Sequence, residues 1–204
     1  MTVELDSDRW DAWRPEEAAR RLGGVEASWY VAAGWAIDLF LGGQRREHED
    51  LEIAIPAASL PQFLEALPGL EVYAVKVPGK GTFTPVDEAG DGLAETHQTW
   101  VRDPESGYWR LDLFREPGDE LTWIYRRDDR IRLPYDQVIA RTDDGIPYGR
   151  PEIVLLYKAK HVQREKDQAD FEAVLPLLEP ETRERLARWI ELVHPGHTWI
   201  ERLA

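Results

Sequence analysis

Two acidic residues separated by one leucine, Asp50 and Glu52, are the first candidates for chemistry in this chain. Acid-x-acid pairs are frequent here, because 39 of the 204 residues are aspartate or glutamate. This pair, unlike the others, heads an alternating stretch, DLEIAI (50–55), which predicts a strand. Alternation puts Asp50 and Glu52 on one face, opposite the buried Leu51 and Ile53. Two carboxylates held this close repel, and Mg²⁺, a hard divalent cation, is the natural counter-charge.

A third acid lies in a second predicted strand, WRLDLF (109–114). Asp112 is on the opposite face from its two leucine neighbours, among large apolar residues, where a lone carboxylate is costly to bury without a partner. If this strand lies beside 50–55, Asp112 completes a three-carboxylate cluster. Such a cluster can hold one or two metal ions and can supply a general base.

Two alternatives stay open for this third acid. Asp112 can instead be a structural partner for Arg110 or Arg115, which lie on its own strand. Asp91, in the glycine-rich segment 79–92, is the rival candidate. The sequence alone does not decide between them.

The elements that must position these acids follow from periodicity and from turn residues. Helices are predicted at 14–24, 34–43 and 60–67, and strands at 28–34, 50–55, 70–77, 96–103 and 107–116. The last two strands, joined by Pro-Glu-Ser, predict a hairpin, and segment 79–92 predicts a turn region. From Pro151 onward the periodicity is helical. We therefore expect an α+β fold: a mixed sheet flanked by helices over 1–145, and a C-terminal helical lobe over 146–204.

Composition excludes several classes of protein. The chain has no cysteine, so a disulfide framework and a thiolate metal site are both excluded. Its formal net charge of −14 disfavours nucleic-acid binding, which needs a positive surface to neutralise phosphates. The acidic N-terminal segment lacks the apolar stretch of a secretory signal, and no apolar run is long enough to span a bilayer. We expect a cytoplasmic protein without a membrane partner.

The stretch before the acid pair carries a family resemblance. GWAID (34–38) is followed, after a variable segment, by Arg46, His48, Asp50 and Glu52. This resembles the nucleotidyltransferase superfamily that includes DNA polymerase beta, above all its aminoglycoside and lincosamide nucleotidyltransferases. Their corresponding stretch is roughly Gly-Gly-Trp-Ala-Ile-Asp, then Arg-x-His-x-Asp-x-Asp. The likeness returns at KAKHVQREKDQADF (158–171), which is similar to the basic helix pair of these enzymes.

Two positions depart from the family pattern. Ala33 stands where the family has the first of two small residues, usually glycine, and its methyl group can weaken nucleotide binding if backbone must approach a triphosphate. Glu52 replaces the commoner aspartate; it still ligates a hard cation, but its longer side chain shifts the metal.

The resemblance implies a magnesium-dependent transfer of a nucleoside monophosphate, AMP from ATP in the first instance. The acceptor would be a hydroxyl of a small molecule such as an aminoglycoside-like or lincosamide-like antibiotic, and pyrophosphate would leave. The backbone at Gly34 and the following helix N-terminus would contact phosphates. Asp50 and Glu52 would hold one Mg²⁺, and Asp112 would complete a second site or deprotonate the acceptor.

Basic residues would support the nucleotide in this interpretation. Lys158, Lys160, Arg164 and Lys166 can neutralise the β- and γ-phosphates, although a solvated helix paired with its own acids is the alternative. Arg46 can contact the triphosphate. His48 can orient Asp50. Alternatively, Arg46 and His48 belong to a turn packed against acidic neighbours.

Other conspicuous residues favour structural roles. Asp38 is expected to be a structural acid, and Trp35 a core residue rather than a base-stacking one. His194 and His197 have a spacing that permits metal binding, but Pro195 and Gly196 between them favour a turn.

Three other functions remain open. The enzyme could modify a macromolecule, a protein or a tRNA 3′ end, as toxin–antitoxin relatives do. The chain could be a non-catalytic binding module whose phosphate loop is spoiled by Ala33. A metal-dependent hydrolase using the same carboxylates would lack the histidine ligands that such sites commonly recruit.

Overall fold

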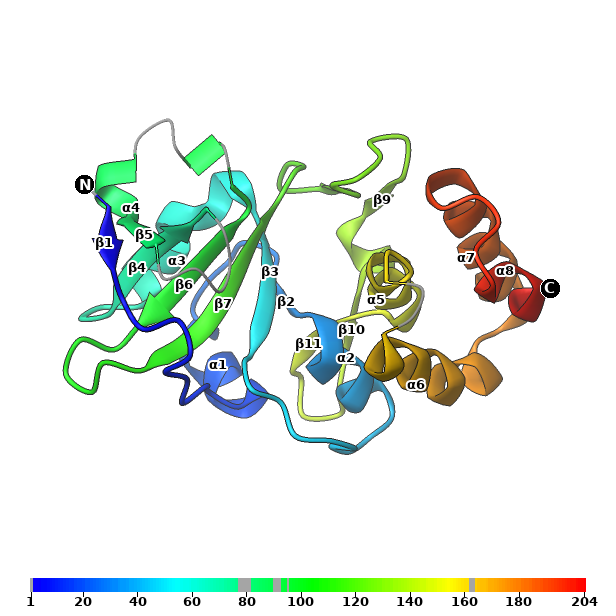
Figure 1. Ribbon diagram of the computed structural model, residues 1–204, viewed down its shortest axis with the longest axis horizontal. Helices are drawn as coiled ribbons and strands as arrows, with labels where there is room; N and C mark the ends of the chain where they lie inside the picture. Colours follow the sequence, from blue (N-terminus) through cyan, green and yellow to red (C-terminus); the bar gives the residue numbers. More distant parts are fainter. Residues whose placement is uncertain (1, 77–81, 90–92, 95, 162–163) are drawn as a thin grey trace.

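The computed structural model describes residues 2–76, 82–89, 93–94, 96–161 and 164–204. Nine strands form a mixed sheet in the order β1-β5-β4-β6-β7-β3-β2-β11-β10 (Figure 1). These are β1 (Val3–Glu4), β2 (Tyr30–Val31), β3 (Glu52–Pro56), β4 (Glu71–Val75), β5 (Thr82–Pro85), β6 (Gln98–Arg102), β7 (Trp109–Glu116), β10 (Ile139–Arg141) and β11 (Pro147–Gly149). A separate hairpin joins β8 (Thr122–Ile124) to β9 (Arg132–Pro134).

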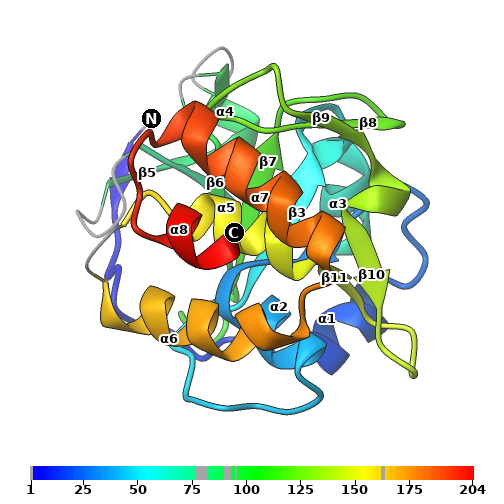
Figure 2. The same ribbon diagram turned by 90° about the vertical axis from the view of Figure 1, so that its right-hand side faces the viewer.

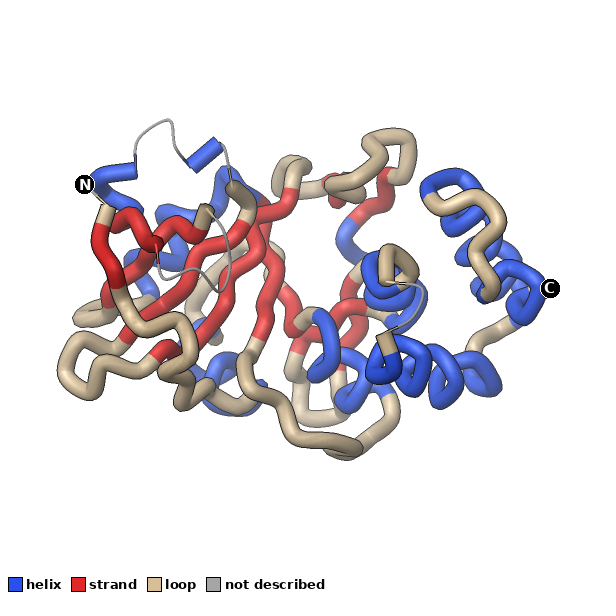
Figure 3. The backbone as a smooth tube through the Cα atoms, viewed as in Figure 1, coloured by secondary structure: helices blue, strands red, loops and turns tan. Residues whose placement is uncertain are grey.

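Helices surround this sheet and form the C-terminal end of the molecule (Figures 1 and 3). They are α1 (Pro15–Leu22), α2 (Ala33–Phe40), α3 (Leu60–Ala66), α4 (Val86–Ala89), α5 (Pro151–Lys158), α6 (Glu165–Val174), α7 (Pro180–Val193) and α8 (Trp199–Leu203). The α+β fold class expected from the sequence is confirmed. The division at residue 145 stays a prediction; β11, which follows it, pairs with β2 in the main sheet.

The local sequence explains the first helix. α1 begins with Pro15, whose fixed backbone angle suits a first turn, and acidic Glu16 and Glu17 follow there. Arg20 and Arg21 occupy its last turn, so charges of both signs complement the helix dipole.

The two faces of the sheet are covered differently. α1 and α3 pack into the main core on one face, together with the inward side chains of β3 and β7. On the other face lies an aromatic cluster of Tyr73, Phe83, Trp100 and Trp109, against which Trp10 of the N-terminal segment packs. Figure 2 shows α5 to α8 gathered at the end of the molecule that carries the C-terminus. α2 contacts both α5 and α6, which connects the helical end to the sheet.

Three predicted elements differ from the structure. Segment 79–92 was expected to be a turn, yet its described part contains β5 and α4, because the alternating Thr-Phe-Thr at 82–84 is typical of a strand. The strand expected at 28–34 is only two residues long, since α2 begins at Ala33. The turn expected at 194–200 ends early, because α8 begins at Trp199. Asp91, the rival third acid, lies outside the described residues.

Candidate active site

Parallel pairing of β3 and β7 brings two of the predicted acids together. Glu52 lies directly opposite Asp112 in the register of these strands, and the Asp112 backbone N–H donates to the Leu51 carbonyl at 2.9 Å. The Ala32 N–H donates to the Glu52 carbonyl at 2.8 Å, which ties the start of α2 to the same point. The first residue of β3 is therefore bonded to the start of α2 and lies beside the middle of β7.

Asp112 is buried, with 2% of its surface exposed, and only one of its oxygens is satisfied. Gln98 of β6 donates from Nε2 to Asp112 Oδ2 at 2.8 Å. Asp112 Oδ1 makes no well-formed hydrogen bond among the described residues, and neither does the indole N–H of Trp100, its cross-strand neighbour, although this indole is near enough to lower the pKa of Asp112 somewhat. A buried carboxylate oxygen without a donor is costly, so this atom fits a ligand for a cation.

The pKa of each of the three carboxylates is raised. Burial, and then the charge of Asp50, raises the pKa of Glu52 to about 7. Burial, and then the charge of Glu52, holds the pKa of Asp112 well above its ordinary value. Burial also raises the pKa of Asp50, although the charge of Lys166 partly offsets it. These residues are close enough to repel, and a positive charge among them would relieve that repulsion.

Asp50, Glu52 and Asp112 are not arranged as a complete metal coordination shell. Within the described part of the chain, no three histidine or acidic side chains are already arranged to hold a metal ion. The acids nevertheless fit a hard cation, because Asp112 Oδ1 lacks a donor and the neighbouring carboxylates resist ionisation together.

The space beside Gly34 is filled by side chains of the following loop. A Cβ at Gly34 would lie 2.7 Å from Cε1 of His48 and would also collide with the Arg46 guanidinium. His48 Nε2 and Asp38 Oδ2 are 2.7 Å apart, and the imidazole stacks on Trp35 with ring centroids 4.4 Å apart. The structure therefore pairs His48 with the buried Asp38, whereas the sequence suggested that it orients Asp50. Glycine is required here by this close approach.

Ala33 has a backbone angle φ of +49°, in the left-handed region. It is the one non-glycine residue with positive φ in the described chain. An alanine in this conformation is strained by about 1 kcal/mol relative to glycine, because its Cβ approaches the following carbonyl. The departure from the family pattern thus falls on a conformation that favours glycine.

The predicted basic residues are divided between two environments. Lys158 is buried, and its Nζ lies 2.6 Å from Asp167 Oδ1 and 3.0 Å from Asp170 Oδ2. This is the ion-paired arrangement that the sequence left open as an alternative to phosphate binding. Lys160 and Lys166 are exposed and make no ion pair within the described residues.

Comparison with known proteins identifies the architecture. A family model of aminoglycoside-2''-adenylyltransferase matches residues 17–80, which contain Gly34, Asp50 and Glu52. The lincomycin-bound lincosamide antibiotic adenylyltransferase LnuA superposes with a TM-score of 0.52 at 17% identity, covering 77% of this chain and 91% of LnuA. The antibiotic-resistance factor ANT(2'')-Ia in solution gives 0.52 at 14% identity, covering 89% and 94%. This chain has a nucleotidyltransferase fold. No curated protein matches it in sequence.

Within this nucleotidyltransferase fold, the sequence did not predict a further buried carboxylate, Glu116. Glu116, at the end of β7, accepts hydrogen bonds from the Tyr30 hydroxyl at 2.5 Å, the Trp123 indole at 2.7 Å and the Tyr157 hydroxyl at 2.7 Å. These donors come from β2, β8 and α5 respectively. Gln98 was also missed, because an amide gives no signal until its strand pairing places it beside Asp112.

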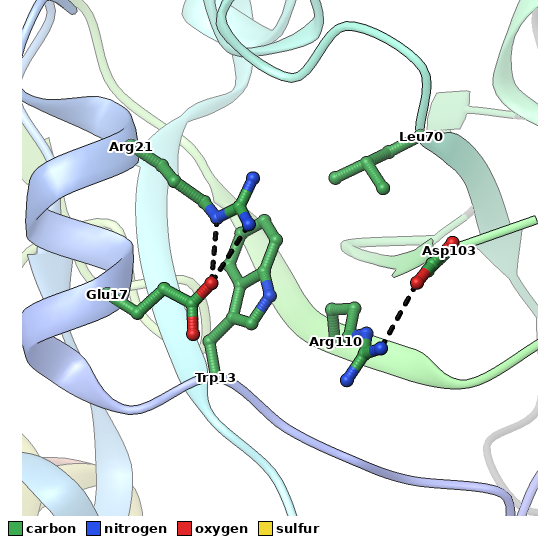
Figure 4. Close-up of a pocket in the computed structure, with 6 residues that line it drawn as sticks. All are labelled: Trp13, Glu17, Arg21, Leu70, Asp103 and Arg110. Atoms are coloured by element: carbon green, nitrogen blue, oxygen red, sulfur yellow. Dashed lines mark hydrogen bonds and ion pairs between the residues drawn. The ribbon is translucent and has the colours of Figure 1, made fainter. Parts of the chain in front are cut away.

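Two remaining features lie apart from the carboxylates. His197 accepts the Trp199 N–H through Nδ1 at 3.1 Å, which is a structural role at the start of α8. A hollow of about 160 Å³ (Figure 4) is lined by Trp13, Glu17, Arg21, Leu70, Asp103 and Arg110. It includes no predicted site residue, and its arginines already pair with its acids.

None of the helices in the described ranges is long and apolar enough to cross a membrane.

Proposed function

We propose that this protein is a magnesium-dependent adenylyltransferase that transfers AMP from ATP to a hydroxyl of a small molecule. The observation that carries the proposal is the register of Glu52 against Asp112, with Asp50 two residues earlier and one oxygen of Asp112 left without a donor. Folding alone gives no reason to crowd three carboxylates in this way.

Asp50 and Glu52 would hold one Mg²⁺, and Asp112 would complete a second site. When bound, Mg²⁺ would neutralise phosphate charge and favour loss of the acceptor proton. Gln98 keeps one oxygen of Asp112 engaged, so Oδ1 is the atom that faces a cation or a proton.

In the chemical step, a carboxylate of this site would accept the proton of the acceptor hydroxyl. The acceptor hydroxyl oxygen forms a bond to the α-phosphorus of ATP while the bond from that phosphorus to the bridging oxygen breaks, and pyrophosphate leaves. The hydroxyl proton would pass to Asp112 in the alternative in which this carboxylate acts as general base and does not hold a second Mg²⁺. Most of the rate enhancement would come from position and charge neutralisation.

Charged groups on the Asp50 side would receive the nucleotide phosphates. Lys166 is exposed and forms no ion pair among the residues that the structure describes, and its charge partly offsets the burial that raises the pKa of Asp50. Arg46 lies against Gly34, so its guanidinium rather than the bare helix terminus would contact phosphate. Lys158 would act through the field that it contributes at Glu52, because Asp167 and Asp170 already hold its ammonium.

The acceptor class rests on relatives. The matching family model describes aminoglycoside-2''-adenylyltransferases, and LnuA is a lincosamide antibiotic adenylyltransferase with lincomycin bound. These support an antibiotic-like acceptor and a role in antibiotic resistance. ATP as co-substrate would place the reaction in the cytoplasm.

Calorimetric titration of a non-hydrolysable ATP analogue, with and without Mg²⁺, tests the proposal. Native protein should bind only with Mg²⁺, and Asp50→Asn should weaken binding at least tenfold. Glu181→Gln is the matched control, because it removes the same charge from an exposed acid-x-acid pair on α7. If the native protein does not bind the ATP analogue, the proposal that it is an enzyme is wrong, and a degenerate binding module is favoured.

A further inference from the structure

The hollow beside Trp13 has the composition of a small binding site (Figure 4). One wall is formed by Glu17 and Arg21 of α1. The opposite wall is formed by Asp103, just after β6, and Arg110 of β7, and the Trp13 indole lies between the two walls. The hollow measures about 160 Å³. One water molecule takes up roughly 30 Å³ in the liquid, so the hollow admits a small organic molecule.

Ion pairs hold both walls in place. Arg21 donates from Nε and Nη2 to Oε1 of Glu17, at 3.0 and 2.9 Å. The guanidinium carbon of Arg21 also lies 4.4 Å from the centroid of the Trp13 ring. Across the hollow, Arg110 donates from Nη2 to Oδ2 of Asp103 at 3.1 Å. Each wall therefore carries one charge of each sign, already in position, which lowers the entropic cost of binding a ligand.

Two donors beside the hollow are left without an acceptor. Trp13 is only 5% exposed, yet its indole N–H makes no hydrogen bond within the described residues. Figure 4 shows the indole nitrogen on the edge of the ring that faces Arg110. Arg21 Nη1 also lacks an acceptor in the described part of the chain, since only Nε and Nη2 reach Glu17. A largely buried indole N–H ordinarily has a partner, so this donor indicates a ligand that brings an acceptor.

The balance of charge selects the chemistry of that ligand. Two neighbouring donors, one of them cationic, suit a carboxylate. A carboxylate alone would add a negative charge beside Glu17 and Asp103, whose charges the two arginines already balance. An ammonium group on the same molecule removes this excess, and Asp103 is the acid that faces it from the opposite wall. Leu70, which also lines the hollow, offers an apolar contact.

We propose that the hollow binds a small zwitterion, a free α-amino acid with an apolar side chain. Its carboxylate accepts hydrogen bonds from Trp13 Nε1 and Arg21 Nη1, its ammonium group lies toward Asp103, and its side chain contacts Leu70. The hollow shares no residue with the carboxylates of the candidate active site. This inference therefore stands independently of the proposed function and assigns a second site to the molecule.

L-Valine is the probe for this site. It is titrated into the native protein without nucleotide or Mg²⁺, by calorimetry and by NMR of the tryptophan indole N–H signals, and Trp13→Phe assigns the signal of Trp13. Valine should bind and shift that signal to saturation. Isovalerate lacks the ammonium group of valine and isobutylamine lacks its carboxylate, so each should bind at least tenfold more weakly.

Two neighbouring arginines of α1 provide the matched variants. Arg21→Gln removes the cationic donor and should weaken valine binding about tenfold, as expected for loss of a hydrogen bond to a charged group. Arg20→Gln is the control, because Arg20 also pairs with Glu17, at 3.7 Å, but does not line the hollow. This control should change the affinity less than twofold.

Each contrary outcome removes a definite part of the inference. If valine up to its solubility limit does not shift the Trp13 signal, or binds equally to the Arg20→Gln and Arg21→Gln proteins, the site is overturned. Isovalerate that binds as tightly as valine overturns the zwitterion, and displacement of valine by the ATP analogue assigns the hollow to the nucleotide. If Trp13→Phe does not fold, the indole signal that moves in Arg21→Gln but not in Arg20→Gln gives the assignment, since Arg21 covers that ring.

Discussion

Two groups of buried charges lie within this molecule and are treated in opposite ways. Lys158 is enclosed between Asp167 and Asp170, so opposite charges meet at 2.6 and 3.0 Å. Asp50, Glu52 and Asp112 gather like charges instead, and the pKa of Glu52 rises to about 7, through burial and then Asp50. The first group connects α5 to α6, so its role is structural. The second group, whose charges repel, would be stabilised by a bound cation.

Glu116 sharpens this difference, because it is a buried carboxylate without a cation yet with every oxygen satisfied. Two tyrosine hydroxyls and one indole N–H donate to it. Burial alone therefore does not mark a functional acid. Asp112 differs from Glu116 because its Oδ1 makes no hydrogen bond within the described residues. Asp167 shares that feature, but Lys158 holds its other oxygen at 2.6 Å, whereas no cation pairs with Asp112 in the part of the chain that the structure describes.

The largest effect on stability should come from breaking the compensated group. Lys158→Met leaves Asp167 and Asp170 buried together without their ammonium, and removing one partner of a buried ion pair costs about 3–5 kcal/mol. Urea unfolding at pH 7.5 measures this loss. The paired experiment is Asp112→Asn, which removes a like charge and should leave the free energy of unfolding unchanged or higher. Equal losses in the two variants would contradict the distinction.

Glu116 should give the next largest effect. In Glu116→Gln the shape is kept, but an amide NH₂ replaces one acceptor oxygen and meets at least one donor group. An NH₂ group in the place of Oε2 would meet the Trp123 indole, which cannot accept a hydrogen bond. An NH₂ group in the place of Oε1 would force the Tyr157 hydroxyl to accept instead of donate. We expect a loss of about 1–3 kcal/mol in the free energy of unfolding, measured by the same urea titration. An unchanged midpoint would show that the carboxylate is not needed as an acceptor.

The sequence was informative where the determinants are local. Alternation along 50–55 and along 109–114 predicted two strands and the faces of Glu52 and Asp112, and their pairing was stated as a condition that the structure meets. The hairpin of β6 and β7 is also confirmed. The roles of these acids stay predictions.

Long-range contacts could not be predicted from the sequence, because they depend on the folded topology. The three residues that donate to Glu116 come from segments as far apart as Tyr30 and Tyr157, 127 positions, and only the folded topology brings them together. His48 has two acids within reach of its loop, and the sequence does not show that α2 turns Asp38 toward it.

A smaller effect is expected from the titration of His97. The pKa of His97 is lowered to about 4, first by burial and then by the neighbouring cations, below an ordinary value near 6.5. Because the folded state disfavours the imidazolium, the stability contributed by neutral His97 is present above pH 6.5 and is lost as pH falls toward 4. After discounting for solvent screening, the loss is about 1 kcal/mol. His97→Gln should remove it.

The measurement is urea unfolding of native and His97→Gln protein at pH 7.5 and pH 4.5. The difference in free energy of unfolding between the two proteins should change by about 1 kcal/mol across this interval. His161→Gln serves as the control, since that imidazole is exposed. Parallel pH profiles for native and His97→Gln protein would show that burial and the neighbouring charges do not lower the pKa of His97.

The smallest effect concerns Ala33, which separates strain from function at the entry to α2. Its φ of +49° is strained for alanine, so Ala33→Gly relieves about 1 kcal/mol in the folded state, while the freer unfolded chain returns part of that. We expect a net gain of about 0.5 kcal/mol, or roughly 1–2 °C in the melting temperature. Affinity for the ATP analogue should change less than threefold, because Arg46 and His48 already occupy the space beside Gly34. A large rise in affinity from no measurable binding would instead mean that the alanine methyl blocks the phosphates, and the chain would then be a degenerate member of its fold.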